Sequence, residues 1–513
     1  METGQGRLEW RLADQRPAAT TTPPPPSATP GAPDTTRVRP TTAPPAPEAT
    51  AVPPAAIAVS PTAAPADSSE LAHRIGVRVS NGTGEFYDRL TGERFIPRGF
   101  NYVRLAPMSA ADPNLWHSTL NPGLYEPERA AAALQAMGAA GYNVVRVFVD
   151  CCRAGNNAGD PRGGVSQAYL ANVIDFLDKA KANGITVLLV LDLTPTQGGY
   201  DEMWGYCCTV FDGENLRYLT PGGHAGERRF DRDFIQALMA NNAPLEAIFA
   251  FDLTNEVHFN VDKPPFSLSS GKVTTANHKT YDMASADDKQ RMMDENLVYW
   301  IDQMRASILE VDPTALVTVS FPAINSGNTT VNPQPAILES TADFVDLHAY
   351  MGWGLSFEEY MRRFGVDGPT EKPLILGEFG AERRAYRSAA TAARALTEWQ
   401  AESCQYGFDG WLLWTWDGEE QETLWHAMSE NGEIGGALSP VERPDPCQPS
   451  KRPGVDGLLG RRRPGARGRL HHHRRDRRFG LVWHAGRRLT AFAVLSRDSP
   501  LCKLKPGPAA PGA

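Results

Sequence analysis

Two carboxylate side chains stand directly after apolar, strand-like runs of the sequence. The stretch FAFDLTNEVHF (249–259) passes abruptly from an apolar run to Asn255 and Glu256, and LILGEFG places Glu378 at the end of another such run. A helix cap or an ion pair would explain one such Glu. Two of them at corresponding strand ends favour a shared site, because parallel strands of a barrel present their C-terminal ends on one side.

Two carboxyl groups that face each other can break a glycosidic bond. One of them must be protonated to assist departure of the leaving oxygen, and the other must be ionised to attack the anomeric carbon. Retaining enzymes hold the two groups about 5–5.5 Å apart, and inverting enzymes hold them farther apart. The negative charge of the nucleophile raises the proton affinity of its neighbour, which helps to keep the acid protonated near neutral pH.

The elements that must position this pair form a regular alternation after residue 76. Continuous apolar runs, typical of strands covered on both faces, alternate with amphipathic stretches such as 170–177, 293–308 and 388–405. The sequence therefore predicts an α/β chain with one (β/α)8 TIM barrel, as the catalytic domain, over residues 76–447. The eight predicted strands are 95–102, 143–150, 185–192, 247–254, 315–321, 344–350, 372–379 and 409–416.

Further candidate site residues fall at the ends of other predicted strands. Arg146 is permanently charged and could hold a carboxylate at two points, or could form a structural ion pair. His348 and Tyr350 are two residues apart, so both point to one face of their strand, although His348 could be a core histidine. Aromatic rings can stack on sugar rings, but each of these could instead be core packing. The remaining substrate-binding candidates are Trp414, Trp416, Trp353, Trp204, Trp425 and Asn101, with Asp150 as a further pocket residue.

These motifs in strand order resemble glycoside hydrolase family 5, the cellulase family, within the clan of (β/α)8 retaining glycosidases. The resemblance covers roughly residues 76–440. It implies that Glu256 is the general acid/base, that Asn255 contacts the sugar 2-hydroxyl, and that Glu378 in GEFG is the nucleophile. One position departs from the pattern. The family often has D-x-His after strand three, whereas LDLTP gives Asp192 and Thr194 here, as in branches that include mannan-cleaving enzymes.

The resemblance also implies roles for the supporting residues. Arg146 in NVVRVF matches the Arg that pairs with the nucleophile and keeps it ionised. His348 and Tyr350 in HAY match the His-x-Tyr of strand six, whose Tyr donates a hydrogen bond to the nucleophile. Trp414 in LLWTW matches the Trp that floors the sugar subsite at the cleavage point.

The expected activity is that of a retaining β-glycosidase on a β-linked glycan, with β-1,4-glucan first. A β-mannanase is the alternative within the family. An inactive carbohydrate-binding barrel is an alternative of another class, and the presence of both Glu256 and Glu378 argues against it. Isomerases and aldolases of this fold usually need a metal cluster, a Schiff-base Lys or a phosphate loop, and the sequence suggests none of these. We expect no cofactor and no metal, and a monomeric enzyme whose partner is a polysaccharide or oligosaccharide.

The regions outside the predicted barrel differ in composition. After a 1–16 segment, residues 17–69 are rich in Pro, Thr and Ala, which predicts a disordered linker and suggests a secreted enzyme, although no signal peptide is visible. The 448–513 tail is basic, with 16 Lys and Arg against 3 Asp and Glu from Lys451 onward, and reads as disordered or out-of-frame sequence. The whole chain has a net charge of −9, so the part outside the basic tail is strongly acidic. An acidic protein surface argues against a nucleic-acid partner. The sequence contains no run of 18 or more apolar residues, so it predicts no transmembrane helix.

Seven cysteines include two adjacent pairs, Cys151 with Cys152 and Cys207 with Cys208. The two pairs could bridge each other in an oxidising compartment, or remain free thiols.

Overall fold

The computed structural model describes residues 73–107, 115–150, 152, 157–205, 210–323, 331–418 and 421–448. The predicted segments 1–16 and 17–69, and the basic tail apart from Gln448, lie outside the described residues. Within the described part, none of the helices combines the length and the apolar character that are needed to cross a bilayer.

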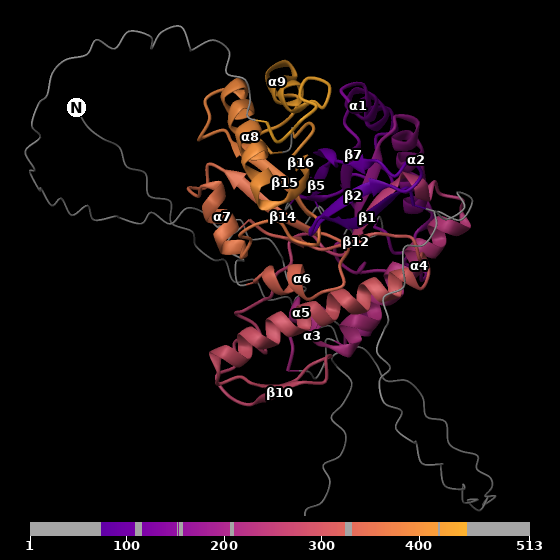
Figure 1. The fold of residues 1–513 in the computed structure, drawn as a ribbon. Coiled ribbons are helices and arrows are strands. Elements are labelled where there is room, and N and C mark those ends of the chain that lie inside the picture. The colour runs from indigo at the N-terminus through magenta and orange to yellow at the C-terminus, as the bar shows by residue number, and fades with distance from the viewer. Residues whose placement is uncertain are drawn as a thin grey trace, which may run out of the picture. The chain divides into compact units, whose positions relative to one another are not determined.

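Parallel strands close into a barrel of eight positions in the described part of the chain, with helices around the outside (Figure 1). The fifth position is divided at Val319: β12 pairs with β9 on one side and β13 pairs with β14 on the other, which completes the ring. The predicted (β/α)8 barrel is confirmed, with every predicted strand present. The barrel strands are β4 (Arg98–Asn101), β7 (Val144–Phe148), β8 (Thr186–Val190), β9 (Ile248–Asp252), β12 (Val317–Thr318), β13 (Ser320–Phe321), β14 (Val345–Met351), β15 (Leu374–Glu382) and β16 (Phe408–Leu413).

The helices bury one apolar face against this barrel. In α2 the N-terminus is capped by Ser166, whose hydroxyl accepts from the Tyr169 N–H, and Leu170, Val173 and Leu177 are buried at helical spacing. Gly184 follows the helix with φ 68°, the left-handed conformation that glycine commonly adopts just after a helix end. The helices are α1 (Pro127–Ala139), α2 (Gln167–Ala182), α3 (Asn215–Leu219), α4 (Pro221–Ala240), α5 (Ala286–Leu309), α6 (Gln334–Leu338), α7 (Phe357–Phe364), α8 (Ala389–Ser403) and α9 (Ser429–Leu438).

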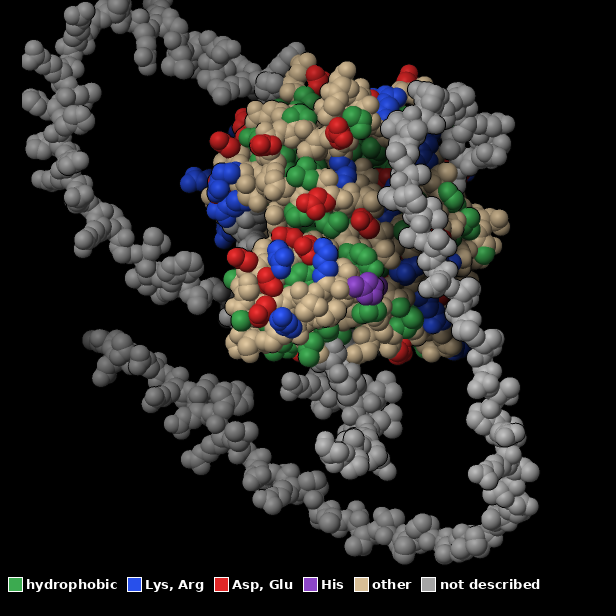
Figure 2. Space-filling model, turned by 60° about the horizontal axis from the view of Figure 1, so that its bottom comes forward, with side chains coloured by type: hydrophobic (Ala, Val, Ile, Leu, Met, Phe, Trp, Pro, Cys, Tyr) green, Lys and Arg blue, Asp and Glu red, His purple; other side chains and the backbone are tan. Residues whose placement is uncertain are grey.

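Short elements decorate the loops between these strands and helices. The β10–β11 hairpin lies beside the beginning of α5 (Figure 1), where the Asp282 N–H donates to Asp288. Figure 2 shows one face of the molecule, on which acidic and basic side chains are interspersed among neutral ones. The short elements are β5 (Leu105–Pro107), β6 (Leu115–His117), β10 (Lys272–Thr274), β11 (Thr280–Asp282), β17 (Leu424–Trp425) and the 3₁₀ turns η1 (Asp201–Trp204), η2 (Leu245–Ala247) and η3 (Cys404–Tyr406).

A small antiparallel sheet packs its apolar side chains onto the interior of the barrel. It consists of β1 (Ile75–Ser80), β2 (Thr83–Asp88) and β3 (Arg94–Phe95). Phe86 is fully buried and meets Phe249 and Phe344 edge-on, at ring-centroid distances of 5.2 and 5.0 Å. The same cluster includes Val144, which lies two residues before Arg146 on β7. The sheet thus seals the end of the barrel opposite the C-terminal ends of the strands.

A disulfide joins Cys404, after α8, to Cys447 near the end of the described residues. This pairing was not predicted from the sequence. Cys152 is disulfide-bonded as well. The other three cysteines of the two predicted adjacent pairs lie outside the described residues, so a bridge between those pairs remains a prediction.

Candidate active site

Arg146 stands at the centre of the site, fully buried on β7. Its Nη1 donates to Glu378 Oε1 at 2.7 Å and to Asn101 Oδ1 at 3.1 Å. Its Nη2 donates to Asp252 Oδ2 at 2.9 Å and to Asn255 Oδ1 at 3.0 Å. One permanently charged fork therefore connects strands β4, β9 and β15 and the loop after β9, because guanidinium can donate several hydrogen bonds in a fixed plane.

Both oxygens of Glu378 accept hydrogen bonds from protein donors. Arg146 holds Oε1, and the Tyr350 hydroxyl donates to Oε2 at 2.6 Å. Tyr350 lies on the neighbouring strand β14, where His348 pairs in register with Glu378. Burial raises the pKa of Glu378, while the charges of His348 and Arg146 and the Tyr350 hydrogen bond act in the opposite direction. The donors on both oxygens stabilise the ionised form, but burial and the charge of Glu256 outweigh them, so the pKa of Glu378 lies above its usual value.

Glu256 approaches from the loop after β9 with an unusual backbone conformation. Its φ is 55°, in the left-handed region that non-glycine residues seldom adopt. The backbone N–H donates to Ser320 Oγ at 3.0 Å, which holds this conformation in place. Such strain is common at functional sites, where the surrounding structure imposes it. The Glu256 side chain is 30% exposed, whereas that of Glu378 is 5% exposed, so the two carboxyl groups have different surroundings.

The two carboxyl groups and His348 converge on one point. One carboxylate oxygen of Glu256, one of Glu378 and a ring nitrogen of His348 all lie within 4.8 Å of one another. His348 Nδ1 is 2.9 Å from Glu256 Oε1 and 3.5 Å from Glu378 Oε2. These side-chain types can also bind metal ions, but the Arg146 guanidinium 2.7 Å from Glu378 would repel a cation there. The arrangement suits proton transfer and nucleophilic attack better than metal binding.

His348 controls the local electrostatics. Burial alone would lower the pKa of this imidazole, but the carboxylates of Glu378 and Asp346 outweigh burial and raise the pKa to about 10. For Glu256, burial acts to raise the pKa, and the hydrogen bond and charge of His348 outweigh it, so the pKa is lowered. In the unliganded site the proton therefore favours His348 over Glu256.

The tryptophans at the end of β16 differ in their surroundings. Trp414 lies edge-on to Phe148 and His117, with centroids 6.0 and 6.1 Å away, and its indole N–H donates to Gln421. Phe148 is on β7, two residues after Arg146, so this group of rings lies at the mouth above the carboxylates. Trp414 and Trp416 are almost equally buried, at 6% and 7% exposed, and Trp416 packs edge-on against Phe100. The sequence placed both rings on one face, but only Trp414 lies with the rings at the mouth.

The other three predicted tryptophans are engaged by protein groups. Trp353 stacks on Tyr350, with ring centroids 5.0 Å apart, and its N–H donates to Glu382 at 2.7 Å. Trp425 is 6% exposed, lies under the Arg383 guanidinium and donates to the Tyr386 carbonyl. Trp204 is also 6% exposed. Trp353 thus adjoins Tyr350 beside the carboxylates, whereas the Arg383 guanidinium covers the ring of Trp425.

Asn101 and Asp150 are both buried and serve neighbouring protein groups. Asn101 accepts from Arg146 and donates to the Gly377 carbonyl at 2.7 Å. Asp150 accepts from the Asn121 side chain and from the Cys152 N–H. Asn101 therefore orients Arg146 from the neighbouring strand β4, and a contact between Asn101 and substrate remains a prediction.

Several residues of the site were not singled out from the sequence. Asp252 and Ser320 lie on β9 and β13 and contact Arg146 and Glu256, and their inward direction follows from strand alternation once the register is known. His117 stacks on Phe148 with centroids 3.8 Å apart and planes 3° apart. Burial and the charge of Arg146 lower the pKa of His117 to about 3, so the ring is neutral. It comes from the β5–β6 hairpin, which carries no local motif.

The end of β8 carries Asp192 and Thr194 where the family often has His. Asp192 has φ 51° and accepts the Asn255 N–H at 3.2 Å, so it helps to place the residue before Glu256. Burial raises the pKa of Asp192 to about 7, against the charge of Arg217. The Thr194 hydroxyl is buried and forms no hydrogen bond with the described residues.

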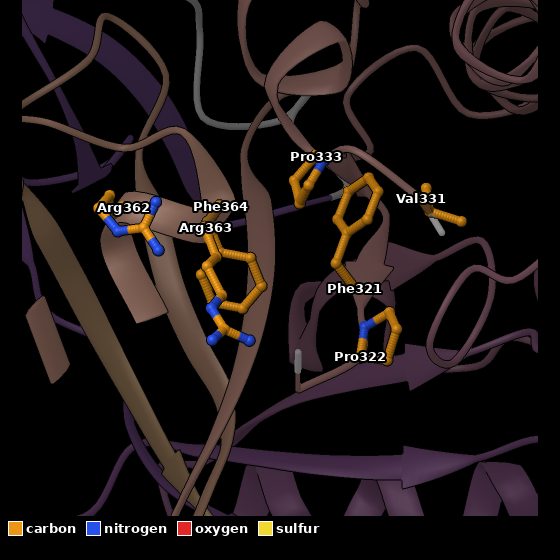
Figure 3. A pocket seen from close by; sticks show the side chains of 7 residues that line it. All are labelled: Phe321, Pro322, Val331, Pro333, Arg362, Arg363 and Phe364. Carbon is orange, nitrogen blue, oxygen red and sulfur yellow. The ribbon is translucent and has the colours of Figure 1, made fainter. Parts of the chain in front are cut away.

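A cavity of about 430 Å³ lies elsewhere, between the end of β13 and α7 (Figure 3). Phe321 and Pro333 face Phe364 across it, and none of the predicted site residues lines it. Arg362 and Arg363 at its edge both donate to Glu359. The cavity therefore lacks the converging acid and base that distinguish the strand ends.

Fold and site together define a glycoside hydrolase with a (β/α)8 barrel. The model of the family described as cellulase (glycosyl hydrolase family 5) matches residues 101–420, and the chain belongs to this family. No curated protein matches the chain significantly by sequence.

Solved structures of mannan-degrading enzymes resemble the chain at low sequence identity. The exo-β-1,4-mannosidase of Opitutaceae bacterium strain TAV5 is 19% identical with a TM-score of 0.47, and the match covers 72% of this chain and 63% of that one. The endo-β-1,4-mannanase of Thermotoga petrophila gives 17% and 0.45, covering 68% and 77%. The endo-1,4-β-mannanase of Rhizomucor miehei gives 14% and 0.48, covering 72% and 100%. At this similarity the matches do not decide the sugar.

Proposed function

We propose that this family 5 glycosidase cleaves β-1,4-linked hexose polymers with retention of anomeric configuration. The observation that carries the proposal is the approach of Glu256 and Glu378 oxygens to within 4.8 Å of each other. Retaining enzymes need close carboxyl groups, because the nucleophile itself reaches the anomeric carbon. Inverting enzymes place a water molecule between carboxylate and sugar and need roughly 6.5–9.5 Å.

The reaction proceeds in two steps. Glu378 attacks the anomeric carbon while Glu256 donates its proton to the leaving oxygen, which gives a glycosyl ester and the released alcohol. Glu256, now ionised, takes a proton from water, and the resulting hydroxyl attacks the anomeric carbon and frees Glu378. The proton taken from water leaves Glu256 protonated again, so the site is restored without a cofactor.

The assignment of the two roles follows from the partners of each carboxyl group. Glu378 is nearly excluded from solvent and held on both oxygens, as a nucleophile that must attack from one fixed position. Glu256 is 30% exposed and can exchange protons with water. Asn255 accepts from Arg146 through Oδ1, which leaves its NH2 group to donate to a sugar hydroxyl. Trp414, among the rings at the mouth, would support the sugar at the cleavage point.

The first candidate substrate is β-1,4-glucan, in line with the family match. The second candidate is β-mannan, which the end of β8 favours. Thr194 stands two residues after Asp192, where the family's glucan-cleaving members often have His, and its buried hydroxyl is smaller than an imidazole ring. The smaller side chain at this position supports the mannan alternative, because mannose carries an axial 2-hydroxyl.

Export and a monomeric state are further parts of the proposal. The Cys404–Cys447 disulfide supports an oxidising compartment, because such bonds are rare in reducing ones. We expect the purified chain to elute as a monomer of 55.9 kDa and to act outside the cell.

The experiment compares the full-length chain with Glu378→Ala on carboxymethylcellulose, mixed-linkage β-glucan, xylan, mannan and aryl β-glycosides, with reducing ends as the readout. Glu442→Ala removes an exposed carboxylate and serves as the matched control. We expect activity on glucan or mannan, a loss of at least about 10³-fold in Glu378→Ala, and no loss in the control. Proton NMR of the first product should show the β anomer. An α anomer would contradict retention, and a folded protein inactive on every substrate would contradict hydrolysis of these glycans.

A further inference from the structure

Asp346 is a buried carboxylate that the two-carboxylate mechanism does not use. It lies on β14, two residues before His348, and is fully buried. Its Oδ1 accepts the Gly377 N–H at 2.6 Å, which fixes it beside the backbone that carries Glu378. A Cβ atom on Gly377 would lie 1.8 Å from Asp346 Oδ2, so glycine at this position allows the carboxylate to approach.

This carboxylate faces two residues of the active site at once. Asp346 Oδ1 is 3.7 Å from His348 Nε2, and Oδ2 is 3.7 Å from Arg146 Nε. The atoms Oδ2, Nε2 and Nε are buried and form no hydrogen bond with the described residues. Opposite charges at this separation interact strongly where water is excluded. Asp346 is thus positioned to bias the protonation of His348 from the side opposite Glu256.

The two ring nitrogens of His348 therefore face different carboxylates. Nε2 faces Asp346, and Nδ1 faces Glu256 at 2.9 Å. A proton on Nε2 is favoured by the Asp346 charge, and a second proton on Nδ1 makes the ring an imidazolium that donates to Glu256. Glu256 then accepts this hydrogen bond in its ionised form.

The charges around His348 come from every strand that packs against it, and acidic groups outnumber basic ones. The side chains concerned are Asp346 and Tyr350 on β14, Glu378 on β15, Asp252 on β9, Glu256 and His258 in the loop after β9, and Arg146 on β7. Four carboxyl groups and one permanently charged guanidinium thus surround His348. This excess of acidic groups favours the protonated form of the imidazole.

We propose that Asp346 is a positioning residue that keeps His348 doubly protonated and, through His348, sets how readily Glu256 holds its proton. The proposal rests on the assignment of Glu256 as the acid/base. Asp346 touches neither substrate nor reacting atoms, and it acts only through the imidazole.

The first test reads His348 directly and requires no activity. Full-length protein labelled with ¹⁵N-histidine is titrated by NMR, and the His348 signals are identified by their loss in His348→Gln. We expect both ring nitrogens to be protonated at pH 7 in the wild type. In Asp346→Asn the titration midpoint should fall by at least about 1 pH unit. A neutral His348 in the wild type at pH 7 overturns the proposal even if Asp346→Asn does not fold.

The second test is the pH profile of kcat/KM on whichever glycan the wild type hydrolyses. When His348 loses its proton more readily, Glu256 keeps its own to higher pH. The alkaline limb of Asp346→Asn should therefore move upward. Asp343→Asn, which loses a partly buried carboxylate paired with Arg305 near the start of the same strand, should leave the limb in place.

The outcomes separate this proposal from the proposed function. If the wild type hydrolyses no glycan, the proposed function fails, while the NMR titration still decides the state of His348. If the wild type is active and the His348 midpoint or the alkaline limb of Asp346→Asn is unchanged, the role of Asp346 is wrong. A variant that loses rate equally at all pH values shows a purely structural role and also overturns the proposal.

Discussion

The hydroxyl of Tyr350 donates to Oε2 of Glu378 across 2.6 Å, between neighbouring strands β14 and β15. Arg146 donates to the other oxygen of the same carboxylate at 2.7 Å. The carboxylate is therefore held from two strands, with one donor fixed on each of its oxygens. This clamp makes the position of the proposed nucleophile a property of the fold.

Tyr350→Phe should lower kcat by about 10–100-fold while the protein remains folded. The change removes one hydrogen bond to a charged group, which is worth about 1.5–3 kcal/mol. Tyr360→Phe is the matched control, because among the described residues its hydroxyl donates to the Tyr350 carbonyl, at 3.2 Å, and not to a carboxylate. Initial rates and thermal unfolding of both variants check the prediction. Equal losses of rate in the two variants would contradict a specific role for the Tyr350 hydroxyl.

Binding of substrate should raise the pKa of Glu256. In the open site His348 lowers this pKa, although the carboxyl side chain is 30% exposed. A sugar ring that replaces the adjacent water disfavours the charged form and so moves the pKa upward. The alkaline limb of kcat, which reports the enzyme–substrate complex, should thus lie at higher pH than that of kcat/KM, which reports the free enzyme. Alkaline limbs of kcat and kcat/KM at the same pH would contradict this prediction, because the bound sugar would then leave the pKa of Glu256 unchanged.

Trp414→Phe and Trp416→Phe should have different effects although the residues are two apart. Trp414 lies with Phe148 and His117 at the mouth, so its change should reduce kcat/KM by at least about 10-fold. Trp416 packs on Phe100, so its change should chiefly lower the free energy of unfolding, by roughly 1–3 kcal/mol. Kinetics and urea unfolding on both variants provide the comparison. The reverse pattern would place the sugar platform at Trp416.

Loss of the Cys404–Cys447 disulfide should destabilise the barrel. The two cysteines are 43 positions apart in the sequence. The segment between them contains strand β16, which lies between β15 and β4 in the barrel. A loop of that length corresponds to roughly 4 kcal/mol in the chain-entropy description. Thermal unfolding of Cys404→Ser with Cys447→Ser should give a lower Tm than the wild type, with unchanged kinetics at low temperature. An unchanged Tm would mean that packing alone holds this segment.

The sequence was sufficient for the barrel and for the central pair because their signals are local. Continuous apolar runs located each strand, and Glu256 and Glu378 followed two of those runs directly. A strand's side-chain direction repeats every second residue, which placed His348 and Tyr350 on the same face, where both contact the carboxyl groups.

Contacts made by other segments could not be predicted. Asn101 and Arg146 are 45 residues apart, and only the closed barrel brings Asn101 beneath the guanidinium, where it supports a neighbour. Trp204 and Trp425 were candidate sugar platforms with core packing as the alternative, and α4 and the Arg383 side chain cover them. His117 could not be found, because a hairpin far from any motif carries it over Phe148. Loop paths depend on packing partners that a local pattern does not contain.

The sheet β1–β3 closes one end of the barrel with Phe86 against Phe249 and Phe344. The residues at this end form one packed core with side chains of the barrel strands, so the sheet is a structural plug. Chemistry is thereby confined to the opposite end of the strands, where Glu256 and Glu378 converge. Substitutions in β1–β3 should therefore change how stably the barrel folds without changing which sugar it cleaves.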